Sequence, residues 1–435
     1  MTELDRQTPG LDAAIRASEA ERHALAAQLG PRRAALDLRF WRQSAHLTTP
    51  ASQPAVARKA VEGRTGAVGR ALKRHGLTAA ALAEALDLAT DDVARQLEMG
   101  FRPPVVVLDG EDGIAPDVDT AARATSAAAD VLARADWGPN GMETLRFYRP
   151  PGLALEGSIR DLYTLLWTLC QAGTEAFPLD GIVMPKVEHP EEVDLVNDML
   201  ERAEADLDLP IGSVRVAYLI ESGSALAHLP EIALRAAPRL ASLIFGLADY
   251  SADLGLPSIE RDHPLALWAR SEIIAVAGAV GVPAIDAMTL DFPVAEPHLD
   301  ATANRQRWLD RMRLVYDDAR HARDLGMHGK WVGHPAQLFA VMLAFQRGMT
   351  DDALEREAAK VEAYNAAVAD GTGVTMIAGV MSDRATDRHA RALLHRATAQ
   401  GRFDPDRAHA LGVIGDGDVA AARLAFAASE GRSLG

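Results

Sequence analysis

The 435-residue chain has a single cysteine, Cys170, so it can form no disulfide within itself and has no cysteine cluster for a metal. No apolar run reaches the roughly 18 residues that a membrane-spanning helix needs, and the polar N-terminus lacks the apolar stretch of a secretion signal. Basic residues are also in deficit, since 45 Lys and Arg face 61 Asp and Glu, and a net charge of −16 disfavours binding to nucleic acid phosphates. These deficits predict a cytoplasmic protein that binds neither membrane nor nucleic acid.

Aromatic residues make up only 5% of the chain, but the 48% of apolar residues is close to the globular average and is enough for a folded core. Against an alanine-rich helical background, eight short β-rich runs stand out, and most are apolar throughout rather than alternating. That pattern is typical of strands buried on both faces of a parallel sheet. The runs are AHLTT (45–49), PVVVLD (104–109), ETLRFY (143–148), GIVM (181–184), VRVAYLI (214–220), SLIFG (242–246), PAIDA (283–287) and KWVG (330–333).

Helical stretches separate these runs, and eight alternating strands and helices predict a (β/α)8 barrel. The alternative is a doubly wound open sheet, but that fold more often has a glycine-rich phosphate loop after its first strand, where this chain has TPASQPAVARKA. We expect an N-terminal helical extension over 1–40, the barrel over 41–347 and a C-terminal helical lid over 348–435. A long helical insertion near 55–103 separates the first two strands.

Charged residues follow several predicted strands, at the barrel end that holds the active site in this fold. Glu111 and Asp112 follow the second strand, and Glu221 and Asp249 follow the fifth and sixth. Two carboxylates on neighbouring strands suit Mg²⁺, which keeps several of its waters, although each carboxylate could instead cap a helix or pair with a lysine. Arg146 lies inside an apolar run of the third strand and needs an anionic partner, either a substrate carboxylate or a structural ion pair with Glu111 or Asp112.

Two weaker signals lie near the same predicted end. Lys330, in GMHGKW, could act as a Schiff-base lysine, which is an alternative to a metal for stabilising an enolate. His189, His328 and His334 have no zinc-type helical spacing, so we expect each to be structural. The paired carboxylates therefore favour the metal over the imine.

The order and spacing of five motifs resemble the citrate lyase β-subunit-like family, which includes malyl-CoA and citramalyl-CoA lyases within the HpcH/HpaI aldolase/citrate lyase superfamily. The resemblance runs from about residue 49 to residue 383, most of the chain. In two departures, Gly110 stands where leucine is usual and Ala248 replaces a glutamate often seen before the metal-binding aspartate. The motifs are LDGEDGIAPD, LRF, GIVMPKVE, LIESGSALAHLPEIALRAAPRLASLIFGLADYSADLG and GMHGKWVGHPAQ.

The resemblance implies a Mg²⁺-dependent carbon–carbon lyase, with Mn²⁺ as the alternative ion. It implies that Glu221 and Asp249 bind the metal, with Glu221 also contacting the substrate, and that Arg146 binds the carboxylate of a 2-oxo acid. Glu111 and Asp112 would lie beside the metal as further catalytic residues. The implied second substrate is a CoA thioester, which makes malyl-CoA or citramalyl-CoA the cleaved compound.

The resemblance also implies that the C-terminal lid carries Asp383 into the active site of a neighbouring subunit, where it acts as general acid or base. We therefore expect a homotrimer or a multiple of one. LDGEDG and ADYSADLG lean toward a different enzyme, a class II pyruvate-type aldolase that acts on free hydroxy-oxo acids. Thioester hydrolysis, as in a malate-synthase-like condensation, is another alternative, and a non-catalytic binding protein on a barrel scaffold is the last.

Overall fold

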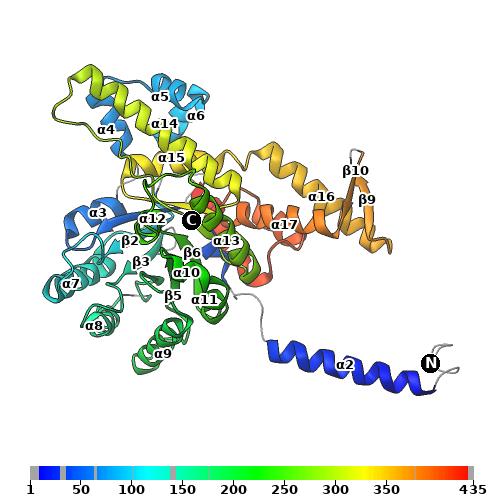
Figure 1. Cartoon of the computed structure of the whole chain (residues 1–435). Coiled ribbons are helices and arrows are strands. Elements are labelled where there is room, and N and C mark those ends of the chain that lie inside the picture. The colour runs from blue at the N-terminus through cyan, green and yellow to red at the C-terminus, as the bar shows by residue number, and fades with distance from the viewer. Residues whose placement is uncertain are drawn as a thin grey trace.

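The computed structural model describes residues 9–29, 36–62, 66–100, 102–137, 144–174, 176–377 and 379–429. Eight parallel strands close into a barrel in the order β1 to β8, with helices around it (Figure 1). All eight predicted strands are present, so the (β/α)8 barrel is confirmed. The strands are β1 (Ala45–Pro50), β2 (Val105–Asp109), β3 (Leu145–Arg149), β4 (Gly181–Met184), β5 (Arg215–Ile220), β6 (Leu240–Phe245), β7 (Ala284–Asp286) and β8 (Gly329–Val332).

The helices that follow the strands complete the repeating units. One or two helices follow most strands, and the connection after β7 is longer than the others before its helix begins. They are α7 (Val118–Arg134), α8 (Ser158–Cys170), α9 (Pro190–Asp206), α10 (Gly223–Ala227), α11 (Leu229–Ala236), α12 (Leu247–Asp253), α13 (Pro264–Val280), α14 (Ala301–Leu325) and α15 (Pro335–Gln346).

Alternation along each strand divides its side chains between the barrel interior and the surrounding helices. In β2, Val105 and Val107 belong to the interior cluster with Phe147 of β3, whereas Val106 and Leu108 pack outward. All five side chains are buried, which explains why the strand sequences are apolar throughout.

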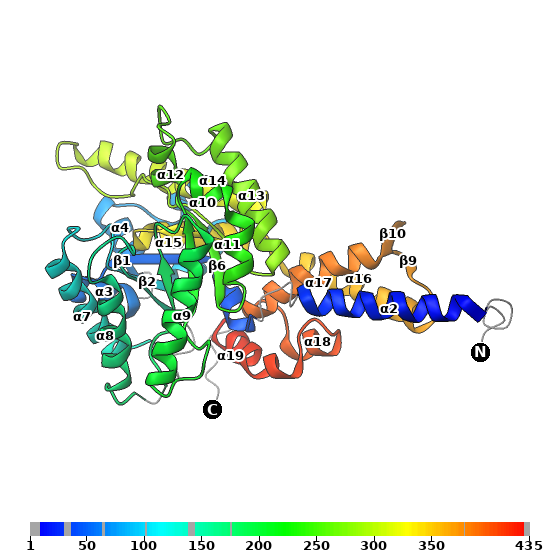
Figure 2. The same ribbon diagram turned by 60° about the horizontal axis from the view of Figure 1, so that its bottom comes forward.

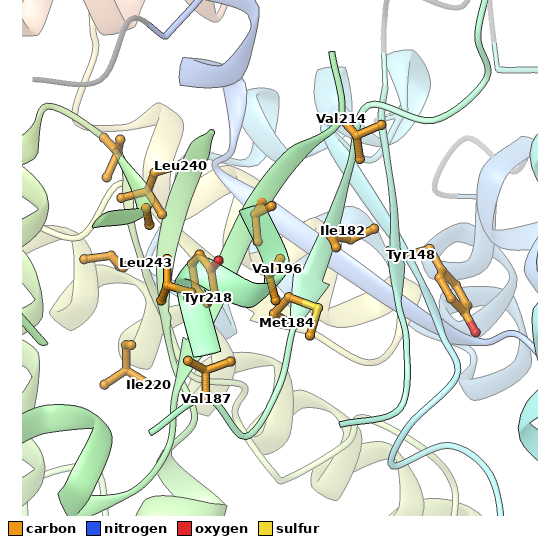
Figure 3. Packing of buried hydrophobic residues seen from close by; sticks show 14 of the residues in the cluster. Tyr148, Ile182, Met184, Val187, Val196, Val214, Tyr218, Ile220, Leu240 and Leu243 are labelled. Carbon is orange, nitrogen blue, oxygen red and sulfur yellow. The ribbon is translucent and has the colours of Figure 1, made fainter. Parts of the chain in front are cut away.

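The outward layer is the larger of the two cores. Ile182 and Met184 of β4 and Tyr218 of β5 lie in it, beside Val196 of α9 (Figure 3). At the N-terminal end of the barrel, Phe40 from the short helix η1 (Leu38–Arg42) joins the interior cluster. Because η1 directly precedes β1, this side chain closes the N-terminal end of the barrel and leaves the C-terminal end for the active site.

The predicted insertion between β1 and β2 is present as four helices. Leu72, Leu82 and Leu86 from this insertion form one apolar cluster with Trp308 and Met312 of α14. Residues 66–99 of the insertion therefore pack on the outside of the barrel, against α14 and α15 (Figure 1), whereas Ala57 and Val61 before them join the outward core. The helices are α3 (Pro54–Glu62), α4 (Gly66–His75), α5 (Ala79–Leu86) and α6 (Thr90–Met99).

The C-terminal segment is not wholly helical, and in this respect the prediction is wrong. Two antiparallel strands form a hairpin around Gly379, whose φ of +79° suits glycine. The prediction missed the hairpin because each strand has only four residues. The elements are α16 (Asp351–Ala369), β9 (Val374–Ile377), β10 (Val380–Asp383), α17 (Arg384–Ala399), α18 (Pro405–Ala410), η3 (Asp416–Asp418) and α19 (Val419–Ser429).

The C-terminal helices dock at the N-terminal end of their own barrel. Leu354, Leu394 and Ala422 share an apolar cluster with Leu38 of η1. The β9–β10 hairpin projects away from the barrel (Figures 1 and 2). Within one chain this segment therefore does not cover the C-terminal ends of the strands, and a lid role remains a prediction about a neighbouring chain.

The N-terminal extension contains helix α2 (Pro9–Leu29), and its residues 13–25 are exposed to solvent. The helix extends away from the barrel (Figure 2). Among the described residues, no helix combines the length and the apolar character that crossing a membrane requires.

A buried ion-pair network joins the last two strands to their helices. Asp286 of β7 lies 2.6 Å from Nε of Arg270 in α13 and 2.8 Å from Nζ of Lys330 in β8. Lys330 is 1% exposed, and its Nζ also lies 3.0 Å from Asp318 of α14. Because two carboxylates hold this amine outside the barrel interior, the structure contradicts the Schiff-base alternative for Lys330.

We expect Asp286→Asn to lower the free energy of unfolding at pH 7 by roughly 3 kcal/mol, because it leaves the buried charge of Arg270 without a carboxylate. Burial alone would raise the pKa of Asp286, but the charges of Lys330 and Arg270 outweigh it and lower the pKa to about 2. The ionised carboxylate therefore contributes its full stability above the unfolded-state pKa near 4, and loses it as the pH falls toward 2.

The measurement is urea unfolding of both proteins between pH 7 and pH 3. The difference between wild type and Asp286→Asn should narrow below pH 4. Asp324→Asn, which removes an exposed partner of Arg323, is the control and should change stability little at either pH. A difference that stays constant with pH would contradict the assignment.

Candidate active site

A pocket of about 240 Å³ opens where β4, β5 and β6 end, and it contains both predicted metal ligands. Glu221 directly follows β5 and continues the interior alternation of Ala217 and Leu219. Asp249 lies in the first turn of α12, just after β6. The structure thus brings these two carboxylates together. The lining residues are Lys186, Glu188, Glu221, Ser222, Asp249, Ala252 and Asp253.

Lys186 lies between the two carboxylates. Its Nζ is 2.6 Å from Oδ1 of Asp249 and 3.6 Å from Oε1 of Glu221. Its backbone N–H donates to the same Glu221 oxygen at 2.8 Å, and its φ of +55° is unusual for a residue other than glycine. Burial alone would lower the pKa of Lys186, but the hydrogen bond to Asp249 and the charge of Glu221 raise it. A single ammonium therefore bridges both predicted metal ligands.

Glu221 has the character of an incomplete metal ligand. Its side chain is 3% exposed, and its buried Oε2 has no hydrogen-bond partner among the described residues. Burial raises the pKa of Glu221 to about 6, against the opposing charge of Lys186. Gly246 adjoins this oxygen, and a Cβ there would lie 3.0 Å from it. An unpartnered buried carboxylate oxygen beside a second carboxylate fits a hard divalent cation.

The number of protein ligands points to the kind of ion. Within the described ranges, no three His, Cys, Asp or Glu side chains converge as a metal-binding set. Glu221 and Asp249 would therefore supply two oxygens to an ion held here, and water or substrate would supply the others. That division suits Mg²⁺, which dehydrates reluctantly, better than Zn²⁺, which takes three or four protein ligands.

A second cluster surrounds Arg149, the last residue of β3. Its Nε and Nη2 donate to the two oxygens of Asp109, each at 2.7 Å. Its Nη1 lies 3.0 Å from Oδ2 of Asp112 and 3.1 Å from Oε2 of Glu111. The guanidinium carbon lies 5.7 Å from the ring centre of Trp331, a cation–π contact. Glu111 and Asp112 are thus brought together, and the cation that holds them is Arg149.

Arg146 does not lie at this site, and the prediction that it binds the substrate carboxylate is wrong. It is the second residue of β3, at the N-terminal end of the barrel, where its Nε is 3.0 Å from Asp180. Asp180 also pairs with Arg39 at 2.7 Å, so the pair is structural. The structural alternative, a pair with Glu111 or Asp112, is wrong for the same reason.

The run LRFYR itself contained the signal that separates the two arginines. Leu145 and Phe147 pack in the barrel interior and Tyr148 packs outward. Arg149 therefore shares the interior alternation and also ends the strand, whereas Arg146 has neither property. Arg149 is therefore the arginine of this strand that lies beside Glu111 and Asp112.

Sequence reasoning also missed the part played by Asp109. Besides Arg149, this carboxylate accepts hydrogen bonds from the backbone N–H groups of Glu111 at 3.0 Å and Gly113 at 3.2 Å. It therefore folds the turn that carries Glu111. Burial is the main cause that raises the pKa of Glu111 to about 8, partly opposed by Arg149 and reinforced by Asp112. Glu111 can consequently hold a proton at neutral pH.

The glycine at position 110 has a steric explanation. A Cβ on Gly110 would lie 2.5 Å from the Tyr148 hydroxyl, which is hydrogen-bonded to Thr125 at 2.7 Å. Tyr148 thus fills the space that a larger residue 110 would need. The small residue at position 110 is thus compensated by the large Tyr148 of β3, and the charged cluster around Arg149 is not disturbed.

Asp383 lies apart from the pocket of its own chain. It ends β10 and caps α17, where backbone N–H groups of Thr386 and Ala385 lower its pKa. The hairpin register pairs Asp383 with Val374 and Met381 with Met376, so all four share one face. The three apolar side chains are exposed, which leaves an apolar hairpin face around the carboxylate.

The three histidines near the predicted end have structural surroundings. His189 and His334 are the N-terminal caps of α9 and α15. His328 directly precedes β8, at the opposite end of the barrel, and its Nδ1 accepts a hydrogen bond from Ala284. The expectation that His328 lies near the active-site end is therefore wrong.

Comparison with known proteins places the chain in a family. Residues 86–335 match the profile of the HpcH/HpaI aldolase/citrate lyase family. An L-malyl-CoA/β-methylmalyl-CoA lyase of Haloarcula marismortui is 27% identical over 335 residues, which cover 71% of this chain and 87% of the relative. The Cereibacter sphaeroides lyase of the same name is 30% identical over 320 residues, covering 67% and 87%. A citrate lyase structure from Burkholderia xenovorans has a TM-score of 0.55 at 25% identity, over 74% of this chain and 91% of that one.

Substituting the two arginines of β3 in parallel tests which of them serves the site. We expect Arg149→Lys to lower turnover on the order of 10²–10³-fold, because a lysine point charge cannot reproduce the bidentate fork. Arg146→Lys is the matched control from the same strand. It should lower the free energy of unfolding by roughly 1.5–3 kcal/mol while the folded protein keeps its turnover. The opposite pattern in steady-state kinetics and urea unfolding would return the role to Arg146.

Proposed function

Because the chain belongs to the HpcH/HpaI aldolase/citrate lyase family and is a carbon–carbon lyase, we propose that it cleaves and forms a bond between a 2-oxo acid and a CoA thioester. Malyl-CoA and citramalyl-CoA are the proposed substrates, since two relatives that cover two thirds of the chain are named malyl-CoA lyases. The observation that carries the proposal is the pairing of Glu221 and Asp249 in one pocket, with a buried carboxylate oxygen left for a cation.

Glu221 and Asp249 are the proposed ligands of Mg²⁺. When bound, the ion supplies Lewis-acid polarisation of the substrate oxygens. It also offsets an excess of negative charge, because Lys186 is the only basic residue among those that line the pocket. Mn²⁺ has the same preference for oxygen ligands and is the proposed substitute.

Arg149 is the proposed site for the carboxylate of the 2-oxo acid. Asp109 and the ring of Trp331 fix its guanidinium in one plane before any substrate arrives. Asp112, which is half exposed, occupies the Nη1 edge and is the partner that a substrate carboxylate would replace. A guanidinium held in this way presents its Nη1 edge to the carboxylate of the acid without further ordering.

Two carboxyl groups suit the proton transfers of the condensation. The ionised Asp383 of a neighbouring chain takes a proton from the methyl carbon of the thioester. The electron pair left on that carbon forms the new bond to the oxo carbon, and the oxo oxygen takes a proton from Glu111, which holds one at neutral pH. Cleavage runs through the same transfers in reverse.

The hairpin is the element proposed to deliver Asp383. Val374, Met376 and Met381 surround it with exposed apolar surface, which favours docking against another protein surface. A second copy of this chain is the proposed partner, in a cyclic homotrimer or a multiple of one. Each active site would then combine the barrel of one chain with the hairpin of the next.

Cleavage assays with Mg²⁺ test the function directly. Malyl-CoA or citramalyl-CoA should yield a 2-oxo acid and acetyl-CoA, and chelation by EDTA, Glu221→Gln or Asp249→Asn should abolish the yield, because two ligands are too few to lose one. Cleavage of a free 4-hydroxy-2-oxo acid alone would instead identify a pyruvate-type aldolase. Release of free CoA without a 2-oxo acid would identify a thioesterase. Binding of 2-oxo acid and Mg²⁺ without turnover would identify a binding protein.

Subunit mixing tests the shared site. Asp383→Ala and Arg149→Ala should each be inactive alone, because each removes one half of every site. When the two are mixed in equal amounts and allowed to exchange subunits, random trimers should recover about a quarter of the wild-type activity, since a cyclic interface joins one intact barrel to one intact hairpin in that fraction of sites. A mixture that stays inactive after proven exchange, or an active monomer in sedimentation, would rule out delivery of Asp383 by a neighbouring chain.

A further inference from the structure

We propose that Lys186 is a built-in cation that occupies the gap between Glu221 and Asp249 and must be displaced when a divalent metal binds, so that it sets the affinity of the metal site. This inference rests on the proposed metal site. It goes beyond that proposal because it assigns a role to a residue that neither holds the metal nor contacts the reacting atoms.

The ammonium of Lys186 lies between the two proposed metal ligands. Lys186, Glu221 and Asp249 follow three consecutive strands, and the Nζ of Lys186 is the one cation among the pocket-lining residues. At 2.6 Å from Asp249 and 3.6 Å from Glu221, it neutralises the two carboxylates that a metal would have to share. A divalent ion between the same oxygens would lie close to the ammonium, and the repulsion of like charges at that distance opposes joint occupancy.

The backbone and the side chain of Lys186 contact Glu221 separately. The backbone N–H donates to Oε1 of Glu221 at 2.8 Å and orients the carboxylate, while Oε2 stays without a hydrogen-bond partner among the described side chains. The φ of +55° that aims this N–H costs conformational energy, as is common at functional sites. The side chain can therefore leave without disturbing the orientation of Glu221.

The side chain of Lys186 has room to move toward solvent. Lys186 is 40% exposed and its partner Asp249 is 42% exposed, so the ammonium can turn to solvent on its flexible stem. The protein that is ready to bind metal is then only the fraction in which this side chain has left, and the apparent dissociation constant is raised in proportion.

Binding of Mn²⁺ to the full chain, measured from the electron paramagnetic resonance signal of the free ion, tests the proposal without any turnover. Lys186→Met removes the charge, keeps the backbone N–H, and should lower the dissociation constant for Mn²⁺ roughly three- to tenfold. Lys186→Arg keeps the charge and should not lower it. Lys186→Gly, which accepts the positive φ without strain, should behave like Lys186→Met and serves if that variant folds poorly.

Lys360 provides a matched control. Its Nζ lies 2.6 Å from Glu357, as close as Lys186 lies to Asp249, and it is 38% exposed. Lys360→Met in α16 should leave Mn²⁺ binding unchanged. Labelling with an amine-reactive reagent gives a second measurement: addition of Mg²⁺ should increase modification of Lys186 severalfold and leave Lys360 as it was.

Two outcomes would overturn the proposal and are distinguishable. If wild type binds Mn²⁺ and Lys186→Met binds it no more tightly, or more weakly, then Lys186 supports the metal rather than competing with it, and the metal site itself stands. If folded wild type binds no Mn²⁺ at all, the metal site and the role of Lys186 both fail. Mn²⁺ binding to Glu221→Gln is the control for the metal site. This variant should lose the binding that wild type shows if Glu221 is a metal ligand.

Discussion

Burial of the barrel strands on both faces is the constraint from which the charged groups of this protein take their places. A charge on such a strand has water on neither side, so it must pair with an opposite charge or lie at the end of the strand. Asp286 and Lys330 pair with each other, between the barrel and its helices. Arg149 meets both conditions, since it is the last residue of β3 and pairs with Asp109. The polar side chains that can meet a substrate are those that the strands release at their C-terminal ends.

The strands and part of the charged site could be predicted from the sequence, but the role of Arg149 and the C-terminal hairpin could not. Burial on both faces leaves uninterrupted apolar runs, so all eight strands were predictable, and Glu221 was predictable as the first charged residue after its strand. Arg146 was misplaced because its position inside an apolar run suggested a need for a substrate carboxylate, and the alternation within LRFYR was not taken into account. The fork between Arg149 and Asp109 joins two strands 40 residues apart, and its register exists only in the folded barrel. The hairpin could not be predicted because strands of four residues are too short to show a clear alternation of apolar and polar residues.

The two charged clusters differ in how firmly they are held. Arg149 is fixed by a bidentate pair and by an aromatic ring, and Asp109 also folds the turn beyond it. The side chain of Lys186 is held only through its ammonium, 2.6 Å from the exposed Asp249 and 3.6 Å from Glu221. A rigid guanidinium suits recognition of a planar carboxylate, and a movable ammonium suits a position that another cation is proposed to take. The site thus combines one preset element with one adjustable element.

The helical insertion also has a consequence for how the chain folds. A closed barrel has one seam where its first strand meets its last, here β1 with β8, some 285 residues apart. Helices α4 to α6 lie between β1 and β2 in the sequence and pack on α14 and α15, the two helices that flank β8. They therefore stabilise the contact between β1 and β8 from outside the barrel. Until α14, β8 and α15 have been synthesised, the apolar side chains of α4 to α6 lack these partners and one edge of β1 is unpaired. Closure of the barrel and burial of the insertion are therefore one late, long-range event, and a fragment that ends before α14 would lack both.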